Sequence, residues 1–211
     1  MSRTQIFNVS EVTPDLLAAA AHALEQGAVA VIPTDTVYGI ATGAFCEGSI
    51  ARICQLKKRS LGQPFQFLMA TTAQVRRVAA WPQEAAALAD AFWPGALTLV
   101  LPPTQVGKPL LRGFAGLGIR VPDTVFLQRL LGALPGPLAC TSANEHGKPV
   151  LTHEQDLVEL FKGHVDFIFK GGTLSPTPSS VVDLTGRPRL LREGALSGEN
   201  LEQVMGCLFT R

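Results

Sequence analysis

The chain has 211 residues, of which 46% are hydrophobic and 17% are charged, and its formal net charge is +1. This length and composition predict a folded globular protein with one sizeable core, and they exclude a disordered chain. The near-neutral charge excludes a protein coated with basic residues for nucleic acid, so any polyanion must meet a local cluster of cations.

Membrane and metal signals are absent from the sequence. No apolar run approaches the roughly 20 residues that span a bilayer, and the first residues lack the apolar region of a signal peptide, so we expect a cytoplasmic protein without a membrane partner. The cysteines form no C-x-x-C pair and the histidines no H-E-x-x-H pattern, so no metal site built by the protein alone is predicted. The cysteines are Cys46, Cys54, Cys140 and Cys207.

The first half of the chain predicts helices that alternate with short apolar strands. Residues 14–27 indicate a helix with Thr13 as its N-cap, Pro14 in its first turn and Gly27 at its end. The other helices expected here are 48–58, 72–79 and 83–92, and the expected strands are 28–34, 65–70 and 97–102.

In the second half, strands cluster toward the end of the chain. A helix over 152–163 is expected to begin with a capping box formed by Thr152 and Gln155. Further helices are expected at 123–132 and 198–208, and strands at 117–122, 137–142, 165–172, 179–186 and 189–194. Without repeats or a long linker, this order predicts a single α/β domain over residues 1–211 with a mixed sheet.

Polar residues stand where several of these strands begin or end. In open α/β sheets ligands gather beyond strand ends, although such residues also cap turns. Arg120 lies inside an apolar strand, where it either faces water or binds an anion. The polar residues at strand ends are Thr34, Asp35, Thr36, Tyr38, Thr141, Ser142, Asn144, Ser179, Ser180 and Arg192.

Three consecutive cations, Lys57, Lys58 and Arg59, close the helix expected at 48–58. One interpretation is electrostatic, because each cation near a helix C-terminus contributes about 0.3–1 kcal/mol through the macrodipole. The other is an anion site. In a continuous helix Lys57 and Arg59 project about 200° apart, so they converge only if the helix ends between them. The helix-breaking segment 60–64 provides such an end and leaves Lys58 to solvent.

Common nucleotide and hydrolase motifs are missing. The sequence has no G-x-x-x-x-G-K-[ST], no G-x-G-x-x-G and no G-x-S-x-G. A nucleotide site must therefore combine side-chain cations, hydroxyls and backbone amides from several loops. Cys140 follows three apolar residues and is expected to be buried and inert rather than a nucleophile.

Several blocks, taken in order, resemble the YrdC-like family, the threonylcarbamoyl-AMP synthases. They are "PTDTVYGIA", "LKKR", "FWPGALTLVL", "IRVPD", "TSAN", "PSSVVD" and "LLREG". The resemblance runs from about residue 12 to about residue 195, and it implies a twisted mixed sheet with helices around a large, positively lined cavity. It also implies synthesis of threonylcarbamoyl-AMP from L-threonine, bicarbonate or CO2, and ATP, with release of pyrophosphate, for modification of tRNA. Mg2+ is expected to arrive with ATP.

The same resemblance assigns roles to residues of this sequence. Lys57 and Arg59 are implied to act on the triphosphate as the catalytic pair. The residues implied to bind ATP are Lys57, Arg59, Ser142, Asn144 and Arg192, and those implied to bind threonine are Thr36, Arg120 and Ser180.

This chain departs from the family pattern near threonine. Where the family commonly has a histidine, the strand at 65–70 has Leu68 or a neighbour. The sequence therefore leaves two alternatives to threonylcarbamoyl-AMP synthesis: an RNA-binding module of the same fold, and a family branch that uses a different carbamoyl or acyl acceptor. Downstream transferases are expected partners if the activity holds.

Overall fold

The first long helix shows how the sequence sets local structure. In the computed structural model, which describes residues 3–60 and 62–210, helix α1 (Pro14–Glu25) begins where Thr13 accepts a hydrogen bond from the backbone N–H of Leu16 at 3.3 Å. It ends before Gly27, whose φ of +96° lies in the left-handed region that glycine adopts without strain. The predicted cap and stop of this helix are both confirmed.

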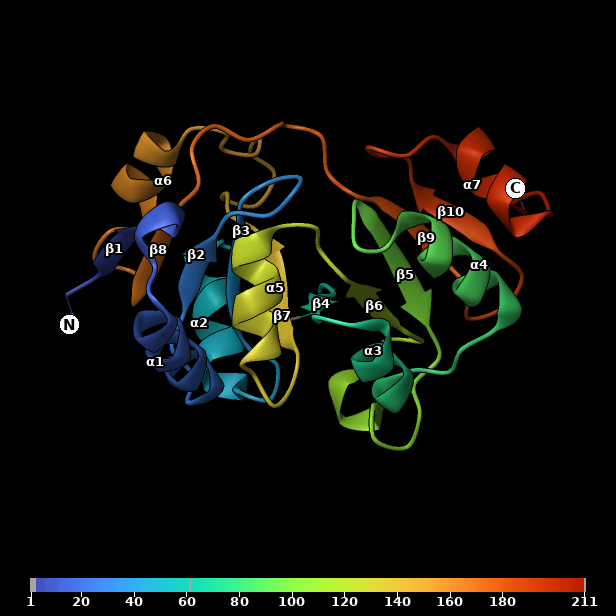
Figure 1. Ribbon diagram of the computed structural model, residues 1–211, viewed down its shortest axis with the longest axis horizontal. Coiled ribbons are helices and arrows are strands. Elements are labelled where there is room, and N and C mark those ends of the chain that lie inside the picture. The colour runs from blue at the N-terminus through green and yellow to red at the C-terminus, as the bar shows by residue number, and fades with distance from the viewer. Residues whose placement is uncertain (1–2, 61, 211) are drawn as a thin grey trace.

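The strands of the described residues form a ten-stranded mixed sheet in the order β1-β8-β2-β3-β7-β4-β6-β5-β9-β10 (Figure 1). Parallel pairs such as β4–β6 stand beside antiparallel pairs such as β4–β7, which confirms the predicted mixed α/β class. The strands are β1 (Gln5–Asn8), β2 (Ala30–Ile32), β3 (Gly39–Gly43), β4 (Gln66–Leu68), β5 (Leu97–Leu101), β6 (Leu117–Arg120), β7 (Leu138–Ser142), β8 (Phe167–Lys170), β9 (Ser180–Asp183) and β10 (Arg189–Arg192).

Helices cover the sheet unequally. One face packs against α2 (Glu47–Leu56), α3 (Thr72–Val78), α4 (Gln83–Phe92), α6 (Glu154–Phe161) and α7 (Gly198–Met205), whose buried side chains join one apolar cluster. On the other face α1 and α5 (Val125–Gly132) pack together over part of the sheet and form a second cluster. The remainder of that second face carries the cavity described below.

Most predicted helices and strands are confirmed with shifted ends, and two strands were not predicted. β1 and β3 are the additions. The predicted capping box is wrong: the residue before α6 is His153, and it makes no side-chain cap. The helix predicted at 48–58 ends at Leu56. Leu61, inside the predicted helix breaker, lies outside the described residues.

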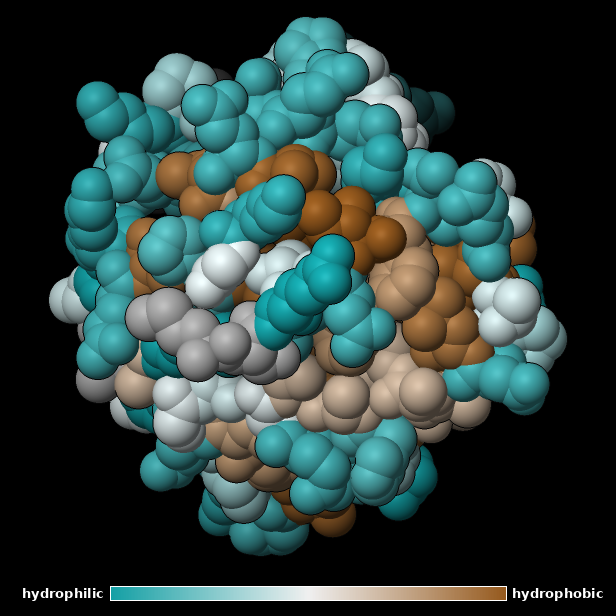
Figure 2. All heavy atoms as spheres, turned by 90° about the vertical axis from the view of Figure 1, so that its left-hand side faces the viewer, coloured by the Kyte–Doolittle hydropathy of each residue, from teal (hydrophilic) through white to brown (hydrophobic). Residues whose placement is uncertain are grey.

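The outer surface is mixed in character. At the end of the molecule that carries β1 and α6, polar side chains interrupt the apolar ones (Figure 2). Among the described residues, no helix has the length and apolar character that crossing a bilayer requires.

Candidate functional site

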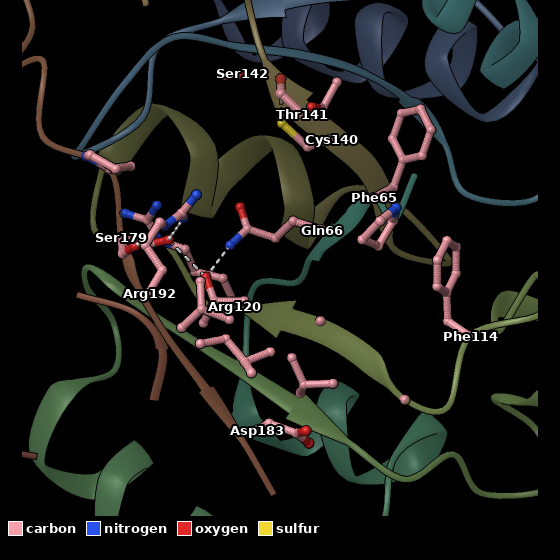
Figure 3. A pocket seen from close by; sticks show the side chains of 18 of the residues that line it. Phe65, Gln66, Phe114, Arg120, Cys140, Thr141, Ser142, Ser179, Asp183 and Arg192 are labelled. Atoms are coloured by element: carbon pink, nitrogen blue, oxygen red, sulfur yellow. Dashed lines mark hydrogen bonds between the residues drawn. The ribbon is translucent and has the colours of Figure 1, made fainter. Parts of the chain in front are cut away.

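A cavity of about 530 Å³ opens on the second face of the sheet, beyond the part that α1 and α5 cover. The register of the strands explains which residues form the floor of this cavity. Thr98 of β5 pairs with Val181 of β9, and Gly118 of β6 pairs with Gln66 of β4, so these residues share one face of the sheet. All four line the cavity (Figure 3).

Arg120 is buried in the cavity wall, with 2% of its surface exposed. Its Nε donates to the carbonyl of Gly95 at 2.9 Å, and its Nη1 donates to Thr36 Oγ1 at 2.7 Å. Thr36 also lines the cavity, and its hydroxyl lies 3.0 Å from that of Thr34. Of the two interpretations of Arg120, the water-facing one is wrong. The guanidinium is held inside the protein beside a threonine hydroxyl.

The remaining nitrogen of Arg120 is not fully satisfied. Nη2 lies 2.7 Å from Asp35 Oδ1, yet the two atoms are not aligned as a hydrogen bond, and both are buried without a hydrogen-bond partner. The two groups therefore form a buried ion pair, and Asp35 balances the charge of Arg120 in the cavity wall.

Lys57 is buried with 3% of its surface exposed, and its ammonium is fully occupied. Its Nζ donates to the carbonyl of Ser142, to the carbonyl of Asn144 at 2.6 Å and to Asn144 Oδ1 at 3.0 Å. An ammonium has three donors, so none is left over. Burial, and next the nearby guanidinium of Arg59, lower the pKa of Lys57 to about 8, so the group stays charged at pH 7.

The loop that follows β7 is held together by the same contacts. Ser142 Oγ donates to Asn144 Oδ1 at 2.6 Å, and Asn144 Nδ2 donates to the carbonyl of Lys148 at 2.5 Å. Ser142 lines the cavity, whereas Lys57 and Asn144 stand behind it and hold the loop in place. The structure therefore brings these three predicted residues together, with only the first at the cavity surface.

Arg59 points to the same region from the other side of the helix end. Its Nη1 donates to Thr141 Oγ1 at 3.2 Å, its Nη2 donates to the carbonyl of Gln63 at 3.4 Å, and its Cζ lies 4.1 Å from the ring centroid of Phe65. Its Nε is buried and has no hydrogen-bond partner. Thr141 and Phe65 line the cavity, so this guanidinium lies directly behind the cavity wall with an unused donor.

Lys58 separates the two cations, as the sequence predicted. α2 ends at Leu56 with Lys57 as its C-cap, one residue before the predicted point, and the φ of +53° at Lys58 then turns the chain between Lys57 and Arg59. The Lys58 side chain is 75% exposed, and its Nζ lies 2.5 Å from Glu145 Oε1. A hydrogen bond from Lys58, and next its charge, lower the pKa of the exposed Glu145 carboxyl. Lys58 thus faces solvent, although it is not free of partners.

Arg192 of β10 closes the opposite wall. Its Nε donates to the carbonyl of Ser179 at 3.0 Å and its Nη2 to Ser179 Oγ at 3.2 Å. Burial, and next the charge of Arg120, lower the pKa of Arg192, which remains a cation at neutral pH. The buried guanidinium of Arg120 and the exposed one of Arg192 thus line one cavity, together with Asp183 and Arg189.

Ser180, predicted to contact threonine, is not among the residues that line this cavity. It is fully buried, and it pairs with Leu97 on the opposite face of the sheet. Its hydroxyl donates to the carbonyl of Leu196 at 2.6 Å and accepts from the backbone N–H groups of Gly194 and Leu196. Because side chains alternate along a strand, the neighbouring Ser179 is the serine that lines the cavity.

Three cavity residues were missed or left undecided by the sequence. Gln66, Thr98 and Ser179 form a connected polar floor, and period-two alternation along β4, β5 and β9 is the signal that points to them. Leu68, where the family histidine was expected, is 1% exposed and packs in the cluster formed with α1 and α5.

Cys140 is buried, as expected. It lines the cavity, yet burial raises the pKa of its thiol to about 12, so it is not a thiolate at neutral pH. Among residues 3–60 and 62–210, no group of three or more histidine, cysteine, aspartate or glutamate side chains is placed to hold a metal ion.

This fold and site define an α/β protein with a mixed sheet and a cavity that Arg120 and Arg192 line. The family model Sua5/YciO/YrdC, described as telomere recombination, matches residues 22–194. The chain therefore belongs to the Sua5/YciO/YrdC family, which confirms the resemblance seen in the sequence.

Similar proteins extend that result. The chain is 37% identical over 191 residues to a threonylcarbamoyl-AMP synthase of Pyrococcus abyssi, covering 89% of this chain and 56% of that protein. It resembles the crystal structure of P. abyssi Sua5 complexed with L-threonine, with a TM-score of 0.89, 34% identity and coverage of 98% of this chain and 62% of that one. Escherichia coli YciO gives a TM-score of 0.85 and 26% identity, covering 95% of this chain and 100% of that one. The chain thus spans little more than half the length of the P. abyssi protein and of a Bacillus subtilis threonylcarbamoyl-AMP synthase.

Proposed function

We propose that the protein synthesises L-threonylcarbamoyl-AMP from L-threonine, bicarbonate or CO2, and ATP, and releases pyrophosphate. The observation that carries this proposal is the buried guanidinium of Arg120, which lines the cavity, donates to Thr36 and is ion-paired with Asp35. Such a group fits the carboxylate of an amino acid. The second support is the name shared by relatives such as the P. abyssi enzyme.

In this reaction the threonine nitrogen attacks the carbon of CO2 and loses a proton, which gives a carbamate. A carbamate oxygen then attacks the α-phosphorus of ATP, and the bond from that phosphorus to the bridging oxygen breaks as pyrophosphate leaves. Because both reactants are anions, the protein acts by positioning them and by stabilising charge. Walls that limit contact with water also protect the carbamate, which decomposes in bulk water.

The residues divide between the two reactants. Arg120 and Thr36 hold the threonine carboxylate on one wall. Arg59 and Arg192 supply charge to the nucleotide from two sides, since each is a planar donor suited to phosphate. Lys57 acts from behind the wall, where it fixes the loop that presents Ser142 and adds a buried positive charge. The P. abyssi Sua5 structure with bound L-threonine agrees with an amino-acid ligand.

Magnesium belongs to the substrate in this proposal. Mg2+ enters with the triphosphate, keeps several of its waters, and needs no protein cage. The product is proposed to serve threonylcarbamoyladenosine formation on tRNA through downstream transferases, in the cytoplasm, where ATP and tRNA meet.

The test is pyrophosphate release with each reactant omitted in turn. We expect release to require threonine and bicarbonate together, and mass spectrometry to detect threonylcarbamoyl-AMP. Release that continues at the same rate without threonine contradicts the proposal. RNA binding that falls steeply with salt, in the absence of any release, favours the RNA-binding alternative instead.

A further inference from the structure

Gln66 anchors a chain of hydrogen bonds across the cavity floor. It stands opposite Gly118, which has no side chain, so the glutamine side chain extends over β6 toward β5. Its Nε2 donates to Thr98 Oγ1, which lies 2.8 Å from Ser179 Oγ, and that oxygen accepts from Arg192 Nη2 at 3.2 Å. Figure 3 shows this chain running from the amide toward the arginine wall.

In this structure the Gln66 amide turns its nitrogen toward Thr98. With the nitrogen committed to Thr98, the amide oxygen Oε1 points away from that bond and into the cavity (Figure 3). The described residues provide no hydrogen bond to this oxygen, and the side chain is half-buried. Three arginines that line the same cavity, Arg120, Arg189 and Arg192, can only donate, whereas the carboxylate of Asp183 is paired with Arg189. Gln66 Oε1 is therefore an acceptor without a partner among the described residues.

We propose that Gln66 Oε1 accepts a hydrogen bond from the side-chain hydroxyl of the amino-acid substrate and thereby selects threonine over valine. This inference rests on the proposed function. Valine has a methyl group where threonine has the hydroxyl, and the two share size and shape. An apolar pocket distinguishes such a pair poorly, whereas a site that hydrogen-bonds the hydroxyl distinguishes it well.

The sheet order places the hydroxyl near this oxygen. β4 lies between β6, which carries Arg120, and β7, which carries Ser142. Arg120 stands opposite Leu68, two residues from Gln66 and on the same face of the sheet, and both Arg120 and Gln66 line the cavity. With the carboxylate of the amino acid at Arg120 and its amine turned toward the nucleotide beyond β7, the third polar group faces the floor. Gln66 is the residue that stands there.

The experiment compares threonine and valine as substrates of Gln66→Met, measured as kcat/KM for pyrophosphate release. Methionine keeps the length of glutamine but removes the acceptor. We expect the threonine-to-valine ratio of kcat/KM to fall at least ~10-fold, the effect of one lost hydrogen bond. Gln66→Glu keeps an acceptor oxygen and is expected to retain the preference for threonine.

The matched control is Gln55→Met, the same substitution at an exposed position of α2, which should leave the ratio unchanged. Thermal unfolding of Gln66→Met establishes that the variant is folded. If release by the unmodified protein depends on threonine but the ratio is unchanged in Gln66→Met, this inference is overturned and the proposed function stands. If release by the unmodified protein ignores threonine, the proposed function itself fails.

Discussion

Replacement of Lys57 by methionine tests whether this buried lysine holds the loop after β7. The substitution keeps an unbranched side chain of similar length but removes all three donors. The carbonyls of Ser142 and Asn144 and the side-chain oxygen of Asn144 then lose a partner that they share. All three acceptors lie close to a side chain with 3% exposure, so water replaces the ammonium poorly.

The expected cost follows from these contacts. A buried polar group left without its partner costs about 1–3 kcal/mol, and methionine recovers part of the total through apolar packing. We therefore expect Lys57→Met to lower the free energy of unfolding by about 3 kcal/mol. For a chain of this size, 1 kcal/mol corresponds to about 2–4 °C, so Tm should fall by ~6–12 °C.

Lys58→Met is the matched control, because it makes the same substitution one residue away. The Lys58 ammonium is largely exposed and pairs with Glu145 at the surface, and such pairs contribute about 0–1 kcal/mol. Thermal unfolding of both variants is the assay, with pyrophosphate release measured in parallel. A Lys57→Met protein that has the same Tm as the wild type but has lost activity would refute the loop-holding role and favour a direct phosphate contact.

Three other predictions address the remaining residues. Arg120→Gln should raise KM for threonine by about 10–100-fold in a threonine titration, and Arg120→Lys should not restore it because the planar fork is lost; an unchanged KM contradicts the carboxylate assignment. Ser180→Ala should lower Tm more than Ser179→Ala does, whereas Ser179→Ala should lower kcat/KM more than Ser180→Ala does. If Ser180→Ala instead has the larger effect on kcat/KM, the assignment of Ser180 to threonine binding is supported. The Cys140 thiol has a folded pKa of about 12 and an unfolded pKa of about 8.5, so its contribution to stability is full below pH 8.5 and falls above it. The stability advantage of the wild type over Cys140→Ala should shrink by on the order of 1 kcal/mol between pH 8 and pH 10 in urea unfolding, and a constant difference contradicts this.

Elements with strong local signals could be predicted from the sequence. Thr13 and Gly27 define α1 through contacts within a few residues, and short runs of apolar and β-branched residues define β5 and β9. β3 had no such signal. It begins at Gly39, where an added Cβ would lie 2.4 Å from Cys140 Sγ, so the fold requires glycine in a position where strand propensity is low.

The sequence indicated which residues gather at the site, but it indicated less well where their side chains point. Lys57 and Arg59 were expected to converge once the helix ended, and the positive φ of Lys58 achieves this. Whether a lysine faces ligand or protein depends on acceptors far along the chain, here at Ser142 and Asn144. The face of the sheet on which Ser180 lies depends on how β9 pairs with β5. This pairing joins distant parts of the chain, so its register cannot be read from a single sequence.

The pairing of β5 with β9 also governs when the cavity can exist during synthesis. Residue 97 of β5 pairs with residue 180 of β9, and β9 and β10 bring the wall that contains Ser179 and Arg192. At about 5–20 residues per second, a ribosome takes about 4–16 s to produce the chain between those positions. Throughout that interval β5 has an open edge that can pair wrongly or attract a chaperone. Nascent chains gain a complete ligand site only after the last two strands have emerged and docked.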